Sequence, residues 1–274
     1  ASFGSRARGA DGNRYALAYL QSRLKAAGLE PRVIAFTNHT PDGPLVFRNL
    51  EAIRTGDTRR IVILTTHYDS MRRGDADFQA ANSAGSGPAV LLGIARVLAQ
   101  TAEPLPAEIR LVFFDGQEPL AQHSAGDGLR GSTDYAARLV AEGTDQRVIA
   151  VINLDMVGDR DLIITLPKNV SVDLRQRLLA AAHTEQARRF IRLFPAEIGD
   201  DHEPFRERGM PALNIIDFEY GSEPGRNDYW RTAEDTIDKI SADSLDIVGR
   251  ITLRLVRDLL TTPPNSAGVK PALL

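Results

Sequence analysis

The chain has 274 residues, 43% of them hydrophobic and 25% charged, so it can bury a sizeable core. Its 33 Lys and Arg against 36 Asp and Glu give a net charge of −3, which argues against a nucleic-acid partner or an anionic membrane surface. It has no cysteine, which excludes disulfides, thiolate zinc sites and thiol catalysis. No apolar stretch approaches the roughly 20 residues of a membrane-spanning helix.

The predicted elements begin with a helix over residues 11–28, which has apolar residues at helical spacing, an Asp at its start and a Gly at its end. Two extended segments follow, 32–36 and 45–53, joined by a turn-rich Thr-Pro-Asp-Gly sequence. Short β-branched runs then alternate with helical segments. The strands are predicted at 61–65, 109–114, 148–154, 161–166 and 212–216, and the helices at 88–100, 133–141, 171–190 and 241–260.

This alternation predicts an α/β fold. Strands that lack strict polar alternation and are separated by helices imply a sheet covered on both faces. We expect one domain over residues 1–262 and a frayed tail over residues 263–274. In such folds ligands bind outside the carboxyl ends of the strands, so the residues next to the strand ends are where a site is expected.

Carboxylates and imidazoles lie at these positions. They follow three of the predicted strands and precede the last one, which turn chemistry alone does not require. The segments are Thr66–Ser70, Asp115–Glu118, Asp155–Gly158 and Asp200–Phe205.

The chain contains seven ordered motifs: HYDS, AANSAGSG, FFDGQE, DGLRGS, NLDMVGD, DDHEPF and YWRTAEDT. Together they resemble the zinc-dependent aminopeptidase superfamily, and DGLRGS, DDHEPF and YWRT resemble its glutaminyl-cyclase branch. The resemblance covers nearly the whole chain and implies a mixed, mostly parallel central sheet flanked by helices. It also implies chemistry at one or two zinc ions with a carboxylate as general base or acid, in a family whose members are often exported.

The resemblance gives roles to residues that this chain retains. His67 and Glu118 match zinc ligands of the two-zinc aminopeptidases. Asp155 matches a carboxylate that binds zinc in the peptidases and joins a hydrogen-bond network in the cyclases. The other matches surround the cyclase pocket: Asp200, Trp230 and His123, the last on a loop either near the pocket mouth or facing solvent.

Three positions depart from the family pattern. Ser83 replaces the bridging Asp, Gln117 replaces the general base, and Arg231 replaces a histidine ligand. A serine hydroxyl is a poor zinc ligand unless it is deprotonated. A carboxamide takes up no proton at neutral pH, and a guanidinium stays protonated and does not ligate metal. We therefore expect no zinc cofactor, with only the remnant ligands His67, Glu118 and Asp155 left.

Three functions follow, in order of preference. The first is a non-catalytic or repurposed pocket that accepts a peptide N-terminus or a small amide. The second is a metal-independent enzyme in which Arg231 supplies positive charge while Glu118, Asp155 or Asp200 moves protons. The third is an active zinc aminopeptidase or glutaminyl cyclase with substitute ligands. The replacements concentrate on the residues expected around the metal. This pattern fits either a pocket that keeps its shape without zinc chemistry or a deliberate inactivation.

Several charged residues also have simpler interpretations. Asp115 is expected to cap the backbone of its own turn, and Asp69 to orient His67. The charged stretch 234–239 is interpreted as a helix start with an exposed face. For Arg231 we predict an inward pose that pairs it with Glu118 or, failing that, with Asp155 or Asp200.

Overall fold

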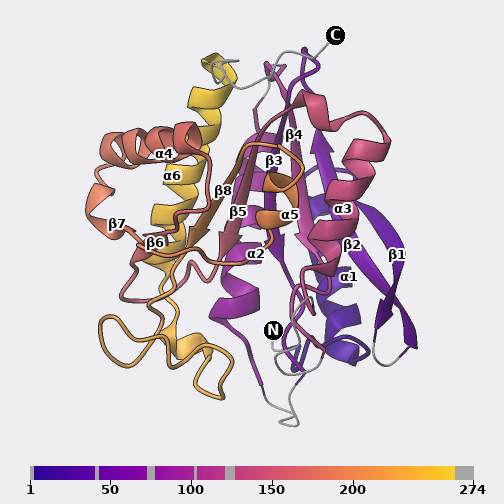
Figure 1. The fold of residues 1–274 in the computed structure, drawn as a ribbon, viewed down its shortest axis with the longest axis vertical. Coiled ribbons are helices and arrows are strands. Elements are labelled where there is room, and N and C mark those ends of the chain that lie inside the picture. The colour runs from indigo at the N-terminus through magenta and orange to yellow at the C-terminus, as the bar shows by residue number, and fades with distance from the viewer. Residues whose placement is uncertain (1–2, 41–42, 73–77, 102–103, 121–126, 263–274) are drawn as a thin grey trace.

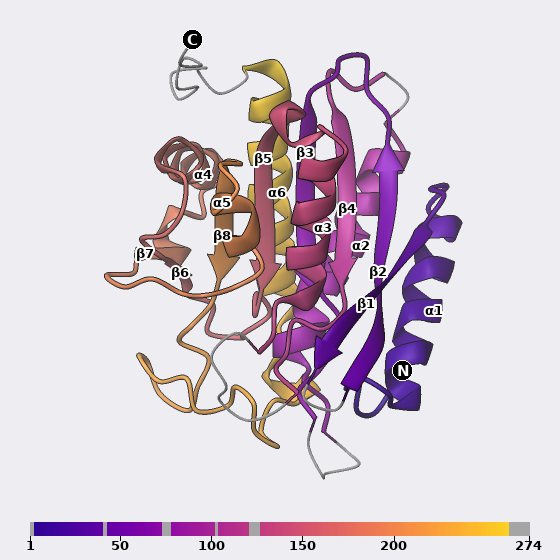
Figure 2. The same cartoon turned by 45° about the vertical axis from the view of Figure 1, so that its right-hand side comes forward.

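A computed structural model describes residues 3–40, 43–72, 78–101, 104–120 and 127–262 of the chain. Its centre is a sheet with helices on both faces (Figures 1 and 2). The strand order across this sheet is β1–β2–β4–β3–β5–β8. Its strands are β1 (Arg32–Thr40), β2 (Gly43–Arg54), β3 (Ile61–His67), β4 (Glu108–Phe114), β5 (Val148–Asp155) and β8 (Ala212–Ile216).

The sheet is mixed but mostly parallel, which confirms the predicted fold class. Strands β4, β3, β5 and β8 run parallel to one another. The edge hairpin differs, since β1 pairs antiparallel with β2 and β2 antiparallel with β4. Every residue of β3 is buried, because helices cover both faces of the central strands.

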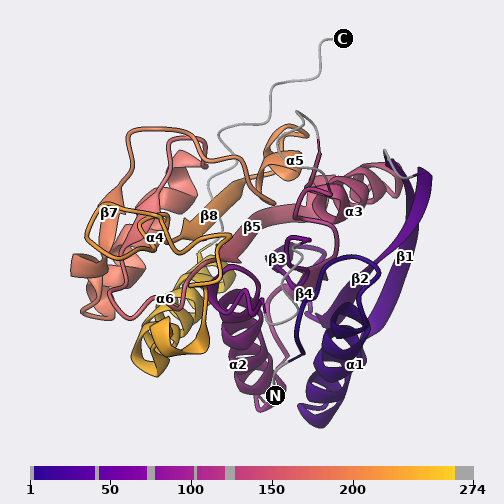
Figure 3. The same ribbon diagram turned by 90° about the horizontal axis from the view of Figure 1, so that it is seen from below.

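The helices form two layers, as Figure 3 shows. Helices α1, α2 and α6 lie on one face of the sheet, and α3 and α5 lie on the other. Helix α4 packs beside α6. The helices are α1 (Asp11–Ala26), α2 (Gly87–Ala99), α3 (Arg130–Ala141), α4 (Val172–Thr184), α5 (Glu203–Arg206) and α6 (Ala242–Thr261).

Helix α6 illustrates how the sequence specifies these layers. Ser241 caps its N-terminus by accepting a hydrogen bond from the backbone N–H of Asp243 at 3.2 Å. Val248, Ile251, Leu255 and Leu259 follow at spacings of three and four residues and are all buried. These buried residues pack the helix against the larger hydrophobic core.

The structure corrects some predicted boundaries. The strand expected over 161–166 begins only at Ile164, and as β6 (Ile164–Leu166) it pairs with β7 (Ile191–Leu193), which was not predicted, in a separate two-stranded parallel sheet. The helix expected over 171–190 ends at Thr184, because Gln186 adopts a left-handed backbone with φ of 57°. Helix α5 was also not predicted, because four residues carry too little periodicity.

The chain also contains shorter helical segments. A π-helical segment, Asn82–Ser86, leads into α2. Turns of 3₁₀-helix are Asp145–Arg147, Arg188–Phe190 and Ile237–Lys239. Within the described ranges, none of the helices combines the length and the apolar character needed to cross a bilayer. The predicted tail, 263–274, lies outside the described residues.

Candidate functional site

The carboxyl ends of three neighbouring strands converge on one cavity of about 290 Å³. His67 and Asp155 are the last residues of β3 and β5, and Gln117 and Glu118 follow β4. Loops near β8 close the remaining walls. The structure thus brings together seven of the predicted site residues: His67, Gln117, Glu118, Asp155, Asp200, Trp230 and Arg231. His123 lies outside the described residues.

His67 lies between two carboxylates. Its Nδ1 is 3.0 Å from the carbonyl oxygen of Asp69 and 3.5 Å from Oδ1 of Asp69, and its Nε2 is 3.4 Å from Oδ1 of Asp155. Burial by itself lowers the pKa of His67, but the hydrogen bonds to Asp155 and Asp69 outweigh it and raise this pKa well above its usual value. The expectation that Asp69 orients His67 agrees with these contacts.

Asp69 has a second partner that the sequence did not suggest. Its two carboxylate oxygens accept hydrogen bonds from the backbone N–H groups of Gln117 and Glu118, each at 3.1 Å. Asp69 therefore fixes the loop after β4 as well as the imidazole after β3. This double contact sets the distance between the two strand ends that carry His67 and Glu118.

Arg231 points into the cavity and pairs with Glu118, which confirms the predicted inward pose. Its Nε and Nη2 both donate to Oε2 of Glu118, at 2.9 and 2.6 Å. The guanidinium carbon lies 4.2 Å from the centre of the Trp230 ring, so the cation also stacks on an aromatic face. Burial raises the pKa of Glu118, and the charge of Arg231 opposes this rise.

Asp200 anchors a buried polar network at the floor of the cavity. Its Oδ2 accepts hydrogen bonds from the side-chain amides of Asn153 and Asn214, both at 2.9 Å. Its Oδ1 accepts one from the Gln117 amide at 3.3 Å. Burial and the nearby charge of Asp155 raise the pKa of Asp200 to about 6. The Oε1 atom of Gln117 is buried and has no hydrogen-bond partner among the described residues.

Ser83 does not line this cavity. Its hydroxyl donates to Oδ2 of Asp235 at 2.6 Å, and Asp235 also accepts hydrogen bonds from the backbone N–H groups of Asn82 and Ser83 and from the Tyr220 hydroxyl. Sequence reasoning missed the role of Asp235. The interpretation of 234–239 as an exposed helix start is wrong for this residue, which is fully buried, because only the folded chain brings it against residues 82–83.

Asp115 also has partners other than those expected. Instead of capping its own turn, it accepts hydrogen bonds from the backbone N–H of Arg48 at 2.9 Å and from the Asn13 side chain at 3.1 Å. Burial raises its pKa to about 7. His202 is buried outside the cavity, with its Nε2 3.2 Å from the carbonyl oxygen of Asn169. Both residues connect elements and do not face a ligand.

A metal ion requires several ligating side chains that lie close together. In the part of the chain that the structure describes, no three or more His, Cys, Asp or Glu side chains come together in a group that could hold a metal ion. A zinc site needs about three or four protein ligands within roughly 2.0–2.3 Å of the ion. One oxygen of Glu118, which the family resemblance predicts as a ligand, accepts hydrogen bonds from the guanidinium of Arg231.

Comparison with known proteins agrees with the fold and the motifs. Residues 49–256 match peptidase family M28. A glutaminyl-peptide cyclotransferase of Drosophila melanogaster is 28% identical over 260 residues, covering 85% of this chain and 72% of that protein. The crystal structure of an Acidobacteriales bacterium glutaminyl cyclase has 34% identity and a TM-score of 0.87, covering 95% of this chain and 90% of that one.

A second solved structure extends the comparison. Porphyromonas gingivalis glutaminyl cyclase is 25% identical, with a TM-score of 0.83 and coverage of 93% of both chains. The likeness therefore includes the central sheet, both helix layers and the strand ends that form the cavity. Because the family match spans well over half of the sequence, this chain belongs to peptidase family M28.

Proposed function

We propose that this chain is a glutaminyl-cyclase-like member of its family whose zinc ligands and general base are replaced, and that it binds a peptide N-terminus or a small amide without zinc catalysis. The observation that carries the proposal is the contact of Arg231 with Glu118, in which two guanidinium N–H groups reach one carboxylate oxygen at 2.9 and 2.6 Å. A cation at hydrogen-bond distance from a ligand oxygen repels a second, divalent cation at the same oxygen.

The two other replaced positions support the same conclusion. The Ser83 hydroxyl donates a hydrogen bond to Oδ2 of Asp235 at 2.6 Å, so it keeps its proton and is directed at a partner other than a metal. The Gln117 amide lies against Asp200 and takes up no proton at neutral pH, so it does not replace a general base. The side chains present therefore do not fit a zinc ion.

The ligand class follows from the polar groups that remain. Asp155, Asp200 and Glu197 give the cavity an excess of carboxylates once Glu118 is paired with Arg231. The unpartnered Oε1 of Gln117 is a buried acceptor that needs an N–H donor. An ammonium or amide group supplies such donors, and Phe218 and Trp230 form an aromatic wall beside it.

The test combines metal content with binding. Protein purified without added metal should contain no stoichiometric zinc by elemental analysis. In calorimetric titration, a short peptide with a free N-terminal glutamine should bind at least about tenfold more tightly than the same peptide acetylated at its N-terminus, because acetylation removes the ammonium charge. Stoichiometric zinc, or equal binding of the two peptides, contradicts the proposal.

The direction of Arg231 also favours a second candidate, a metal-independent enzyme. Its guanidinium lines the cavity, where it would stabilise negative charge that develops on a substrate carbonyl. Glu118, Asp155 and Asp200 line the same cavity and would be the proton-transfer groups. Cyclisation of N-terminal glutamine that persists in excess chelator, and that the Asp200→Asn variant abolishes, would establish this candidate in place of the first.

A further inference from the structure

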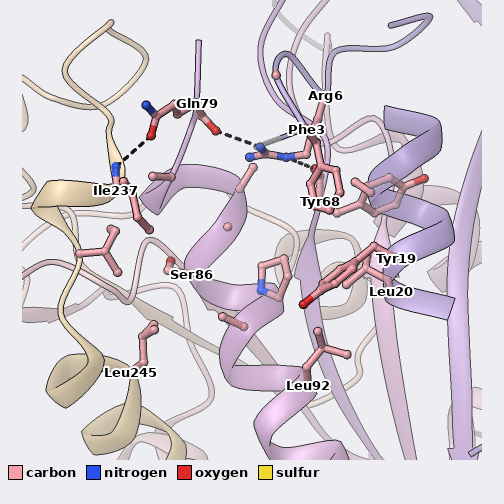
Figure 4. Close-up of a pocket in the computed structure, with 18 residues that line it drawn as sticks. Phe3, Arg6, Tyr19, Leu20, Tyr68, Gln79, Ser86, Leu92, Ile237 and Leu245 are labelled. Atoms are coloured by element: carbon pink, nitrogen blue, oxygen red, sulfur yellow. Dashed lines mark hydrogen bonds between the residues drawn. The ribbon is translucent and has the colours of Figure 1, made fainter. Parts of the chain in front are cut away.

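A second cavity, of about 500 Å³, lies away from the one just described and shares no lining residue with it. It is bounded by the N-terminal segment, α1, the start of α2 and the start of α6 (Figure 4). Its size falls within the range of about 300–1,000 Å³ that is usual for small-molecule pockets. Its walls are mostly apolar and include Phe3, Leu20, Pro88, Leu92, Ile240 and Leu245.

One cation interrupts this apolar lining. Arg6 is only 8% exposed, and its side chain donates to three backbone carbonyl oxygens: to Tyr68 from Nε at 3.0 Å, to Gln79 from Nη1 at 2.9 Å and to Ala80 from Nη2 at 2.9 Å. Arginine is almost never so buried unless it is paired. Carbonyl dipoles satisfy part of the guanidinium, but they supply no counter-charge.

The two carboxylates whose charges act on Arg6, Asp235 and Asp69, form hydrogen bonds with other donors. Asp69 accepts hydrogen bonds from the backbone N–H groups of the loop after β4. Asp235 accepts a hydrogen bond from the Ser83 hydroxyl. Their charges raise the pKa of Arg6, but burial has the larger effect and lowers it. Among the described residues, no carboxylate forms an ion pair with Arg6, and three hydrogen bonds use only three of its five N–H groups.

We propose that this cavity binds a medium-chain fatty acid, with its carboxylate on Arg6 and its alkyl chain along the apolar walls. A carboxylate provides the missing counter-charge and accepts the remaining N–H groups of the guanidinium. In Figure 4, Leu20, Leu92 and Leu245 border the space below Arg6, and the Tyr19 hydroxyl is directed into it. Covering these walls with an alkyl chain removes apolar surface from water, which favours binding.

The first test compares ligands that share an alkyl chain and differ in the head group. Calorimetric titration with decanoate, below its micelle-forming concentration, should show one saturable site per chain. Decanol has the same chain but no carboxylate, so it should bind at least about tenfold more weakly, or about 1.4 kcal/mol. Decanol that binds as tightly as decanoate overturns the proposal, as does decanoate that shows no saturation.

The second test blocks the cavity. Ala89 is an exposed residue of α2 that lines it, so Ala89→Trp should fill the space without disturbing the core, and should weaken decanoate binding at least about tenfold. Ala180→Trp is the matched control, since Ala180 is an exposed position of α4 away from the cavity. Unchanged affinity in Ala89→Trp, or an equal loss in both folded variants, places decanoate elsewhere and overturns the proposal.

Discussion

At the scale of single residues, the pair formed by Arg231 and Glu118 decides the character of the candidate site. The Glu118 side chain is 3% exposed and that of Arg231 is 25% exposed. Arg231 holds its pose with a left-handed backbone, φ of 59°, which costs a non-glycine residue about 1–2 kcal/mol. The ion pair and the stacking on Trp230 offset this cost. Arg231 therefore supplies the counter-charge of the buried Glu118 carboxylate.

Removing that counter-charge should destabilise the protein. In Arg231→Ala, Glu118 becomes a buried carboxylate without its cation, and we expect a loss of about 2–3 kcal/mol in the free energy of unfolding, measured by urea denaturation. Adding Glu118→Gln should recover part of the loss, because a neutral amide needs no cation. Arg226→Ala is the control, since the exposed Arg226–Glu223 pair should contribute less than about 1 kcal/mol. Equal effects of the two arginine substitutions would refute this account.

The proposal that Ser83, Gln117 and Arg231 replace zinc ligands and a general base predicts a gain of metal binding when they are reverted. The combined variant Ser83→Asp, Gln117→Glu and Arg231→His restores the carboxylates and the imidazole of the family pattern, and we expect it to retain stoichiometric zinc in elemental analysis. The variant with only the first two substitutions keeps the arginine cation beside Glu118, so it should hold far less zinc. A triple variant that folds, as judged by circular dichroism, but takes up no zinc would contradict the assignment of these positions.

At the scale of elements, α3 approaches the sheet closely because Gly131 lies in its first turn. A Cβ at this position would come within 2.5 Å of the Asn49 side-chain oxygen and of the Asp115 carbonyl oxygen. Asn49 in turn donates to the carbonyl of Gly131 at 2.9 Å and accepts from the backbone N–H of Asp115 at 3.1 Å. This contact fixes α3 over the end of β4, next to the loop that carries Glu118.

Two glycine substitutions should therefore have opposite effects. Gly131→Ala should lower the free energy of unfolding by about 1–3 kcal/mol, because backbone and side-chain atoms must move apart. Gly93→Ala, in the exposed middle of α2, meets no atom within 4 Å and should stabilise the protein by about 0.5–1 kcal/mol through helix propensity. Chemical denaturation measures both, and a loss in Gly93→Ala equal to that in Gly131→Ala would refute the packing argument.

At the scale of the whole molecule, buried carboxylates make stability depend on pH. Asp217 is fully buried and accepts the backbone N–H groups of Ile163 and Glu219 at 2.8 and 3.0 Å. Burial nevertheless raises its pKa to about 7, whereas an aspartate in the unfolded chain titrates near 3.9. Between these two values the folded state binds more protons than the unfolded state, so stability falls as the pH rises from about 4 to about 7.

We therefore expect the free energy of unfolding, measured by urea denaturation, to be higher at pH 5 than at pH 8. Asp217 should contribute about 2 kcal/mol to this difference in free energy. Asp115, whose pKa is also raised to about 7, acts in the same direction, so the variant Asp217→Asn isolates one contribution. In that variant the difference between pH 5 and pH 8 should shrink. An unchanged difference would show that the Asp217 carboxylate does not titrate as described.

The sequence by itself determined the order of the main elements and the edge of the sheet that carries the candidate site. Apolar periodicity is a local property, so it located helices such as α6 and buried strands such as β3 within a few residues. Parallel strands align their carboxyl ends, so the polar residues after β3, β4 and β5 had to meet, and His67, Glu118 and Asp155 do. The ordered motifs also predicted the family and the inward pose of Arg231.

Apart from the pairs Arg231–Glu118 and Asp69–His67, which the sequence predicted, only the tertiary structure decided the partners of the buried polar side chains. Asp235 meets Ser83 across 152 residues, and Asp115 meets Arg48 across 67, which no local pattern specifies. The pairing of β6 with β7 also joins segments that are too short to carry a periodic signal. A buried polar group must find a hydrogen-bond partner wherever packing supplies one. The partner is therefore a property of the folded chain as a whole, whereas the element that carries the group is a property of the nearby sequence.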